Sequence, residues 1–185
     1  MGKVLYSMNV SLDGYIEDAN GSIEFSTLDE EVHRLANEQA RQTSVFLFGR
    51  RPLRGDGGAV DDGGEPRRPA RRRSGVRPHL RETPRIVFSD TLDSVPEGVR
   101  LVRSKDSVEE VTRLKQQTEG ELDLGGASLA ASLIDLVDEF RLYVMPVVLG
   151  GGKPFFAAGK RLRLRLAEHH ALASGTVYLR YERAD

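Results

Sequence analysis

The chain has 185 residues, no cysteine and a formal net charge of −1. This length supports one domain with a substantial core. The near-neutral charge gives no reason to expect nucleic acid or an anionic membrane as a partner. The lack of cysteine excludes disulfides, a thiol nucleophile and cysteine metal ligands. No apolar stretch approaches the ~20 residues that span a bilayer and no signal-peptide pattern is visible, so we expect a cytoplasmic protein.

The first part of the chain predicts a strand, a loop, a helix and a second strand. Residues 3–10 are an apolar strand that leads into Asp13. Asp13 is most simply a turn residue, and the sharper alternative is a carboxylate in a substrate loop. Residues 29–43 have a helical apolar stripe, and residues 44–48 are a buried-type strand. The strand ends at Gly49-Arg50-Arg51, which fits either a phosphate site or a solvated turn.

Residues 51–82 are different in kind, because Arg, Gly, Pro, Asp and Ala dominate them without hydrophobic periodicity. Such a segment cannot bury enough apolar area to offset its ordering entropy, so we expect it to be disordered within a single domain of residues 1–185. The arginines between Arg67 and Arg73 also fit a basic arm for nucleic acid. No aromatic side chains interleave with them for base stacking, and the near-neutral net charge argues against that partner.

Regular patterning returns at Pro84. The rest of the chain predicts strands at residues 85–89, 99–102, 140–148, 161–165 and 175–183. It also predicts a helix that begins at Asp106 as the N-cap, with Glu109 at the second position of a capping box. Alternating strands and helices followed by strands in series predict an α/β fold with a mixed sheet. The last strand offers an exposed edge at residues 176–181 for pairing with a second copy. His169 and His170 are adjacent on the chain and make a poor metal pair, so we expect no metal site.

Two glycine-rich turns are the candidate ligand loops. A short strand at residues 122–124 leads into Gly125-Gly126 and a helix start. Glycines let a backbone approach a ligand closely, and free N–H groups at a helix start attract phosphate. A tight turn without a ligand fits the same residues, and the Gly-x-Gly-x-x-Gly fingerprint of an ordinary Rossmann domain is absent. Gly150–Gly152, before Lys153, fit either a flexible connection or a loop that closes over a ligand.

Taken together, five motifs resemble the dihydrofolate-reductase-like proteins that share the reductase domain of the bacterial bifunctional riboflavin biosynthesis deaminase-reductase. The motifs are Ser11 to Ile16, Phe48 to Arg51, Pro84 to Ser89, Gly125 to Leu129, and Val137 to Pro154. They cover nearly the whole chain except the arginine-rich segment. The resemblance implies a three-layer fold in which helices flank a central mixed, mostly parallel sheet. It also implies an NADPH-dependent reductase that transfers hydride to a small pteridine- or pyrimidine-like heterocycle.

The resemblance assigns site residues by their position in the motifs. The implied cofactor-binding residues are Gly49, Arg50, Arg51, Ser89, Gly125, Gly126, Ala127, Ser128 and Leu129. Among these, Ser89 would lie at the adenosine 2′-phosphate, and residues 125–129 would hold the pyrophosphate and nicotinamide. Asp13, Gly150 and Gly151 would lie on the substrate side, with Asp13 as the candidate proton donor. The family also suggests a homodimer, and the absence of a His/Cys zinc motif excludes a fused deaminase domain from this chain.

The sequence departs from the family pattern at two places. Asp90 stands after Ser89, where the family often has a basic or neutral residue, and a carboxylate there repels a 2′-phosphate. The family helix that follows Gly49-Arg50-Arg51 is replaced by the arginine-rich segment. One hypothesis is a shifted reading frame in the gene. With suitable codons, reading the bases that encode residues 52–56 in a frame shifted by one base yields Arg-Tyr-Glu-Val-Met, which looks like the family sequence. If the segment is genuine, the alternative function is a non-catalytic nucleotide-binding protein with a damaged cofactor site.

Overall fold

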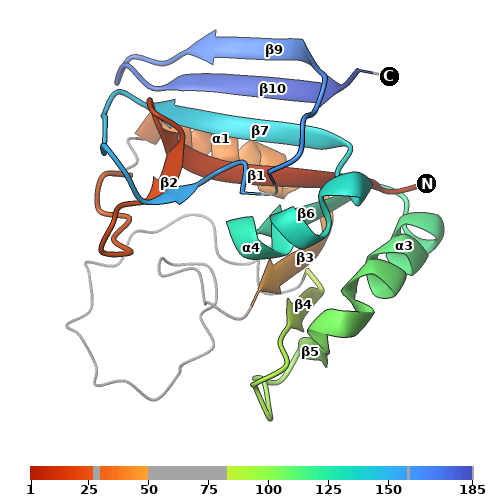
Figure 1. Ribbon diagram of the computed structural model, residues 1–185. Coiled ribbons are helices and arrows are strands. Elements are labelled where there is room, and N and C mark those ends of the chain that lie inside the picture. The colour runs from red at the N-terminus through yellow and green to blue at the C-terminus, as the bar shows by residue number, and fades with distance from the viewer. Residues whose placement is uncertain (27–29, 50–82, 158, 185) are drawn as a thin grey trace.

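The computed structural model describes residues 1–26, 30–49, 83–157 and 159–184, and an eight-stranded sheet forms its centre (Figure 1). The strand order is β5-β4-β3-β6-β1-β7-β10-β9. The six strands from β5 to β7 are parallel, whereas β10 and β9 run antiparallel. Their bounds are β1 (Lys3–Ser11), β3 (Thr43–Gly49), β4 (Arg85–Phe88), β5 (Val99–Val102), β6 (Glu121–Gly125), β7 (Glu139–Met145), β9 (Leu164–Ala171) and β10 (Val177–Arg183). The predicted mixed, mostly parallel sheet is therefore confirmed.

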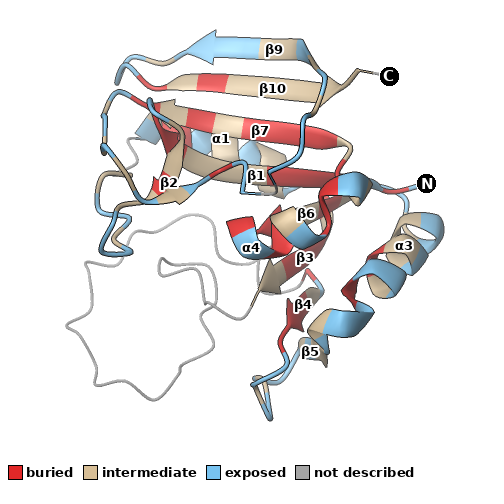
Figure 2. Ribbon diagram, viewed as in Figure 1, coloured by how far each residue is buried: buried red, intermediate tan, exposed pale blue. Residues whose placement is uncertain are grey.

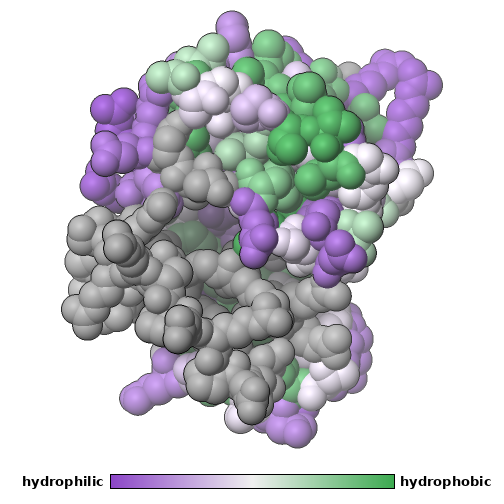
Figure 3. Space-filling view, turned by 90° about the vertical axis from the view of Figure 1, so that its left-hand side faces the viewer, coloured by the Kyte–Doolittle hydropathy of each residue, from purple (hydrophilic) through white to green (hydrophobic). Residues whose placement is uncertain are grey.

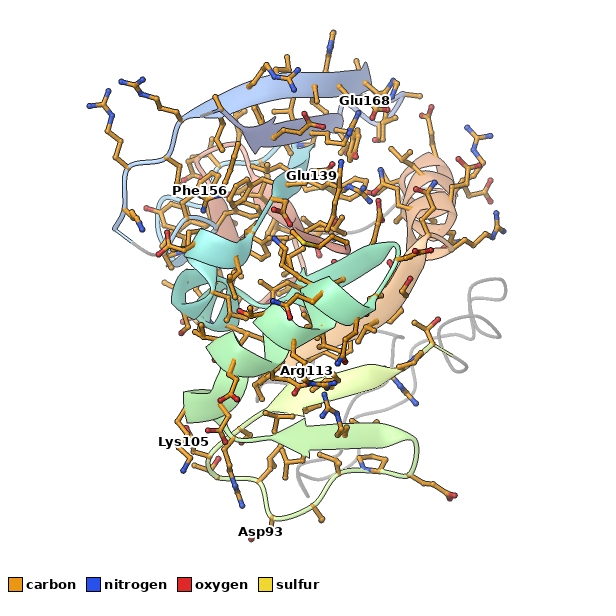
Figure 4. All side chains as sticks on the ribbon, turned by 90° about the vertical axis from the view of Figure 1, so that its right-hand side faces the viewer. Asp93, Lys105, Arg113, Glu139, Phe156 and Glu168 are labelled. Atoms are coloured by element: carbon orange, nitrogen blue, oxygen red, sulfur yellow. The ribbon has the colours of Figure 1, made fainter. Side chains whose placement is uncertain are left out.

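Helices cover both faces of this sheet. Helix α1 (Glu30–Ala40) lies on one face, and α3 (Ser107–Gln117) and α4 (Ala127–Ser132) lie on the other, as the views in Figures 1 and 4 agree. Short 3-10 turns occur at η1 (Ser104–Asp106) and η2 (Ile134–Leu136). A separate two-stranded sheet pairs β2 (Tyr15–Glu17) with β8 (Lys153–Pro154). The result is the three-layer arrangement implied by the sequence resemblance.

The larger core lies between the sheet and helices α3 and α4. Alternate residues of the central strands point into it, and Figure 2 shows buried residues concentrated in these strands and in α4. Its fully buried members include Val4, Tyr6, Leu122, Leu124 and Phe140. Since successive strand residues point to opposite faces, the neighbours of these residues face α1. A smaller cluster of Val32, Tyr143 and Tyr178 forms on that side.

The α1 face of the sheet is more polar and carries a row of ion pairs across several strands. Arg141 contacts Glu121 and Glu139, each at 2.6 Å. Arg180 contacts Glu139 at 3.3 Å and Glu168 at 2.8 Å, and both glutamates are labelled in Figure 4. Glu139 and Arg141 are 2% and 6% exposed, so the pairing of their charges is what makes their burial tolerable.

The chain connections reverse direction at the neighbouring strands β6 and β1. These strands are neighbours in the sheet, yet the chain continues from β1 toward β3 and from β6 toward β7, which lie on opposite sides of the pair. In open α/β sheets, ligands bind outside the carboxyl ends of strands at such a reversal. The loop after β1 and the Gly-Gly turn after β6 therefore lie at the expected position.

Several predicted elements differ from the observed ones. The final strand is not an edge, because β10 pairs with both β7 and β9, so the predicted free edge at residues 176–181 is wrong. The strand predicted at 161–165 is observed as Leu164–Ala171, which contains His169 and His170. Asp106 makes no capping hydrogen bond, because the 3-10 turn η1 runs directly into α3.

Two further features of the described residues bear on function. No helix among them has the length and apolar character needed to cross a membrane. Within the same ranges, His, Cys, Asp and Glu side chains nowhere gather in a group of three or more that could hold a metal ion.

Candidate active site

The Gly-Gly turn after β6 has the backbone geometry of a phosphate cradle. Gly126 has a φ of 100°, and a Cβ built on it would meet no atom of the described residues within 4 Å. The turn leads directly into α4, whose first residues receive no side-chain capping hydrogen bond. Uncapped N–H groups at a helix start, next to open space, suit an anionic group. The residues present at this turn therefore fit a dinucleotide phosphate.

Two of the predicted cofactor segments meet in space. Gly49 ends β3, and a Cβ built on it would lie 3.6 Å from the Cβ of Leu129 in α4. Ala127 and Leu129 are buried and anchor the helix against the sheet, whereas Ser128 is exposed. The predicted partners Arg50 and Arg51 lie outside the described residues, as does the rest of the arginine-rich segment.

The predicted adenosine site follows β4, and its hydroxyl is committed to a turn. Ser89 is 1% exposed, and its Oγ accepts hydrogen bonds from the backbone N–H groups of Thr91 and Leu92 at 3.2 and 3.1 Å. The carboxylate of Asp90 accepts a hydrogen bond of 2.9 Å from the N–H of Ser104. Ser89 therefore stabilises the turn that follows β4. Asp90 joins this turn to the start of η1, and this contact gives the carboxylate at position 90 a structural role.

Asp13 joins the loop after β1 to the loop after β7. Its carboxylate accepts hydrogen bonds from the backbone N–H groups of Leu149 (3.1 Å) and Gly150 (2.7 Å), and from the Ser11 hydroxyl (2.7 Å). These hydrogen bonds, led by the one from Ser11, hold the pKa of Asp13 below its ordinary value. A carboxylate that stays ionised at neutral pH suits holding a loop better than donating a proton.

The glycine loop is joined to the first loop at a second place. A Cβ built on Gly152 would lie 1.9 Å from the carbonyl oxygen of Glu17, so glycine is required for the close approach of the two backbones. The strands β2 and β8 pair beside it, and Lys153 forms an ion pair with Glu17 at 3.6 Å. In the part of the chain that the structure describes, no atom lies within 4 Å of a Cβ built on Gly150 or Gly151. The predicted substrate-side residues therefore belong to one double loop.

The double loop lies on the side of the molecule that carries the carboxyl ends of the parallel strands. Figure 3 views this side and shows hydrophobic residues gathered over part of it. Leu12 and Val148, one in each loop, are 65% and 66% exposed. By contrast, an open apolar hollow of about 590 Å³ lies near the amino ends of β4 and β5, beside Arg85 and Val99. That hollow is remote from the predicted site residues.

Sequence reasoning missed a second polar surface, on the α1 face. Ser7 and Asn9 of β1 pair in register with Arg141 and Tyr143, and both are only half-buried although β1 is a central strand. Asp123 of β6 lies on the same face and is also half-buried. Polar residues at alternate positions of an otherwise apolar strand were the available signal for this surface.

Comparisons with known proteins agree with this geometry. The RibD C-terminal domain family matches residues 2–178 of the chain. The "Uncharacterized protein YyaP" of Bacillus subtilis (strain 168) is 30% identical over 183 residues, which is 97% of this chain and 94% of that protein.

Solved structures show the same fold at lower sequence identity. The deaminase/5-amino-6-(5-phosphoribosylamino)uracil reductase of Thermotoga maritima has a TM-score of 0.69 and 19% identity, with 99% of this chain and 57% of that longer chain covered. The dihydrofolate reductase of Enterococcus faecalis, solved with NADP(H), has a TM-score of 0.63 and 16% identity, with 100% and 98% covered. From the family match and the shared fold together, we conclude that this chain belongs to the RibD C-terminal domain family.

Proposed function

We propose that the protein is an NADPH-dependent reductase that transfers hydride to a small pyrimidine- or pteridine-like heterocycle. The observation that carries the proposal is the meeting of Gly49 and Leu129 beside the open turn at Gly126. These residues belong to motifs far apart in the sequence, and they converge at the carboxyl edge of the sheet, where α/β folds bind nucleotides. The related fold of a dihydrofolate reductase solved with NADP(H) supports the same cofactor class.

The residues have separable tasks in this proposal. The uncapped start of α4 and the Gly126 backbone bind the cofactor phosphates, and the double loop held by Asp13 encloses the substrate side. The bound cofactor supplies the hydride, and the protein supplies orientation and exclusion of water. Asp13 keeps the two loops together, because its ionised carboxylate accepts hydrogen bonds from Leu149 and Gly150.

The test is a titration of the purified protein with NADPH and with NADH, followed by fluorescence. The next step measures NADPH oxidation with 5-amino-6-(5-phosphoribosylamino)uracil and with dihydrofolate. Binding of NADPH with turnover of either compound supports the proposal. Failure of NADPH and NADH to bind refutes it, and binding without turnover of a broad heterocycle panel favours a non-catalytic nucleotide-binding protein.

The preference for NADPH over NADH depends on Asp90. Its carboxylate lies next to Ser89, where the 2′-phosphate of NADPH is expected, so the two negative charges repel each other and NADPH binding is weakened. Asp90→Asn keeps an oxygen for the Ser104 N–H and removes the charge. We expect the ratio of NADPH to NADH affinity to rise by about two- to fivefold, and more at low salt than at high salt. An unchanged ratio at low salt would place the 2′-phosphate elsewhere.

We also propose that the protein acts as a homodimer. Strand β9 ends the sheet and pairs with β10 on one side only among the described residues. Its exposed Leu166 and the unpaired backbone edge suit pairing with a second copy. Light scattering during size-exclusion chromatography tests this, and a monomer at micromolar concentration would refute it.

A further inference from the structure

The α1 face of the sheet holds a carboxyl group that the proposed cofactor and loop contacts leave unused. Asp123 lies in β6, two residues before Gly125. That spacing corresponds to about 7 Å along a strand. Asp123 therefore lies close to the turn expected to hold the cofactor, while its side chain points to the face opposite α4.

The surroundings of Asp123 are apolar on both neighbouring strands. Its cross-strand partners are Leu5 of β1 and Phe46 of β3, which are 1% and 6% exposed. The carboxyl group of Asp123 forms no hydrogen bond or ion pair with another described residue, although its backbone pairs with both neighbouring strands. Because water is largely replaced by hydrocarbon around the carboxyl, burial raises the pKa of Asp123 to about 7.

The charged groups around Asp123 do not cancel the rise in its pKa that burial causes. Arg141 lowers the pKa of Asp123, but its guanidinium is engaged by Glu121 and Glu139. Glu121 raises the pKa further. Helix α1, which packs on the same face, presents uncharged Gln39 to the Tyr143 hydroxyl at 2.7 Å. Asp123 is thus a carboxyl that is protonated in a substantial fraction of molecules at neutral pH.

The same face offers substrate contacts. Ser7 and Asn9 are half-buried on the adjacent strand, and their side chains form no hydrogen bond with another described residue. Asp123 itself keeps accessible surface. A small heterocycle held against this surface would find hydroxyl and amide groups beside a protonated carboxyl. We propose that Asp123 is the catalytic proton donor of this reductase, with Ser7 and Asn9 contacting the same substrate, an inference that rests on the proposed function.

The chemistry balances with the cofactor already proposed. The carbon of a substrate C=N bond accepts hydride from NADPH, and the nitrogen accepts the carboxyl proton of Asp123. The electron pair of the π bond forms the new N–H bond, which leaves Asp123 as a carboxylate and the cofactor as NADP⁺. Solvent then returns a proton to the carboxylate. The substrate class is therefore a small nitrogen heterocycle with a reducible C=N bond.

The experiment compares the wild type with Asp123→Asn, using 5-amino-6-(5-phosphoribosylamino)uracil and dihydrofolate as probes. We expect NADPH affinity within twofold of the wild type, a kcat at least tenfold lower, and loss of the wild-type decline in kcat above pH about 7. Glu121→Gln should move that decline to lower pH, because it removes a charge that raises the pKa of Asp123. Asp106→Asn makes the same chemical change at an exposed, uncapped position and should alter nothing.

The outcomes separate this proposal from the proposed function. A wild type that binds no NADPH refutes both. Equal kcat and pH profiles for the wild type and Asp123→Asn overturn the role of Asp123 and leave the reductase intact. If neither probe is reduced, NMR of carboxyl-labelled aspartates in the NADPH-loaded protein decides. A signal that titrates near pH 7 and is lost in Asp123→Asn supports the proposal, and titration of Asp123 below about pH 5 overturns it.

Discussion

Gly152→Ala should separate the two loops that border the proposed substrate site. Gly152 has a φ of 136°, a conformation that residues with a Cβ rarely adopt. The added Cβ would lie 1.9 Å from the carbonyl oxygen of Glu17 and 2.9 Å from the backbone of Asp18. Since the obstacle is backbone, no side-chain rotation relieves it. The two segments must move apart by about 1 Å before the contact becomes tolerable.

The magnitude follows from two terms. A non-glycine residue in a sparsely populated positive-φ region costs about 1–3 kcal/mol. Separation also weakens the β2–β8 pairing and the Asp13 contacts, and each net hydrogen bond contributes about 1 kcal/mol. A total of about 3 kcal/mol corresponds to a fall in Tm of roughly 6–12 °C for a chain of this size.

Thermal unfolding followed by circular dichroism measures the effect, with Gly151→Ala as the matched control. Gly151 is adjacent, lies outside the left-handed range, and has no described residue within 4 Å of its Cβ position. Alanine there should be neutral or raise stability by about 0.4–1 kcal/mol. If Gly152→Ala melts within about 2 °C of Gly151→Ala, the close approach of the two loops is not the stabilising contact inferred from the structure.

Three further predictions follow from the described contacts. Asp13→Ala should speed amide hydrogen exchange in the loop after β7 severalfold, and unchanged exchange would contradict the role of this carboxylate. Lys115→Met should lower the free energy of unfolding by about 1–3 kcal/mol, because Lys115 bonds Asp138 at 2.6 Å with only 13% of its side chain exposed. The control Lys105→Met, at an exposed lysine, should change the free energy of unfolding little. Asp123→Asn should stabilise the protein increasingly as pH rises from about 4 to 7, since native Asp123 binds its proton more tightly than the unfolded chain. The gain reaches at most roughly 4 kcal/mol above pH 7, and a pH-independent difference in urea unfolding would refute it.

The strands and helices were largely predictable because their signals are local. The apolar run at residues 3–10, the helix predicted to follow Asp106 and the Gly-Gly turn each appear close to the predicted position. The motif order then indicated the three-layer fold. The predicted capping hydrogen bond of Asp106 failed, because a capping motif does not reveal that a 3-10 turn continues into the helix.

The pairing partners of each strand depended on the tertiary structure. Residues 176–181 read as an exposed edge, yet β9 covers β10 on the side away from β7. Edge and interior strands can share the same short-range pattern, since the difference lies in a neighbour that another part of the chain supplies. The bounds of β9 differ from the predicted 161–165 for the same reason, because its pairing with β10 sets where the strand begins and ends.

Propensity and periodicity act over a few residues, so the amino-acid sequence was enough to predict which elements form and where glycine permits a turn. The surroundings of each candidate functional group, by contrast, depend on the tertiary structure. It set Asp13 against the amides of Leu149 and Gly150, and it placed Asp123 between Leu5 and Phe46 of the neighbouring strands. Hydrogen bonds and desolvation set the ionisation of a carboxyl, and here both come from residues distant in the chain.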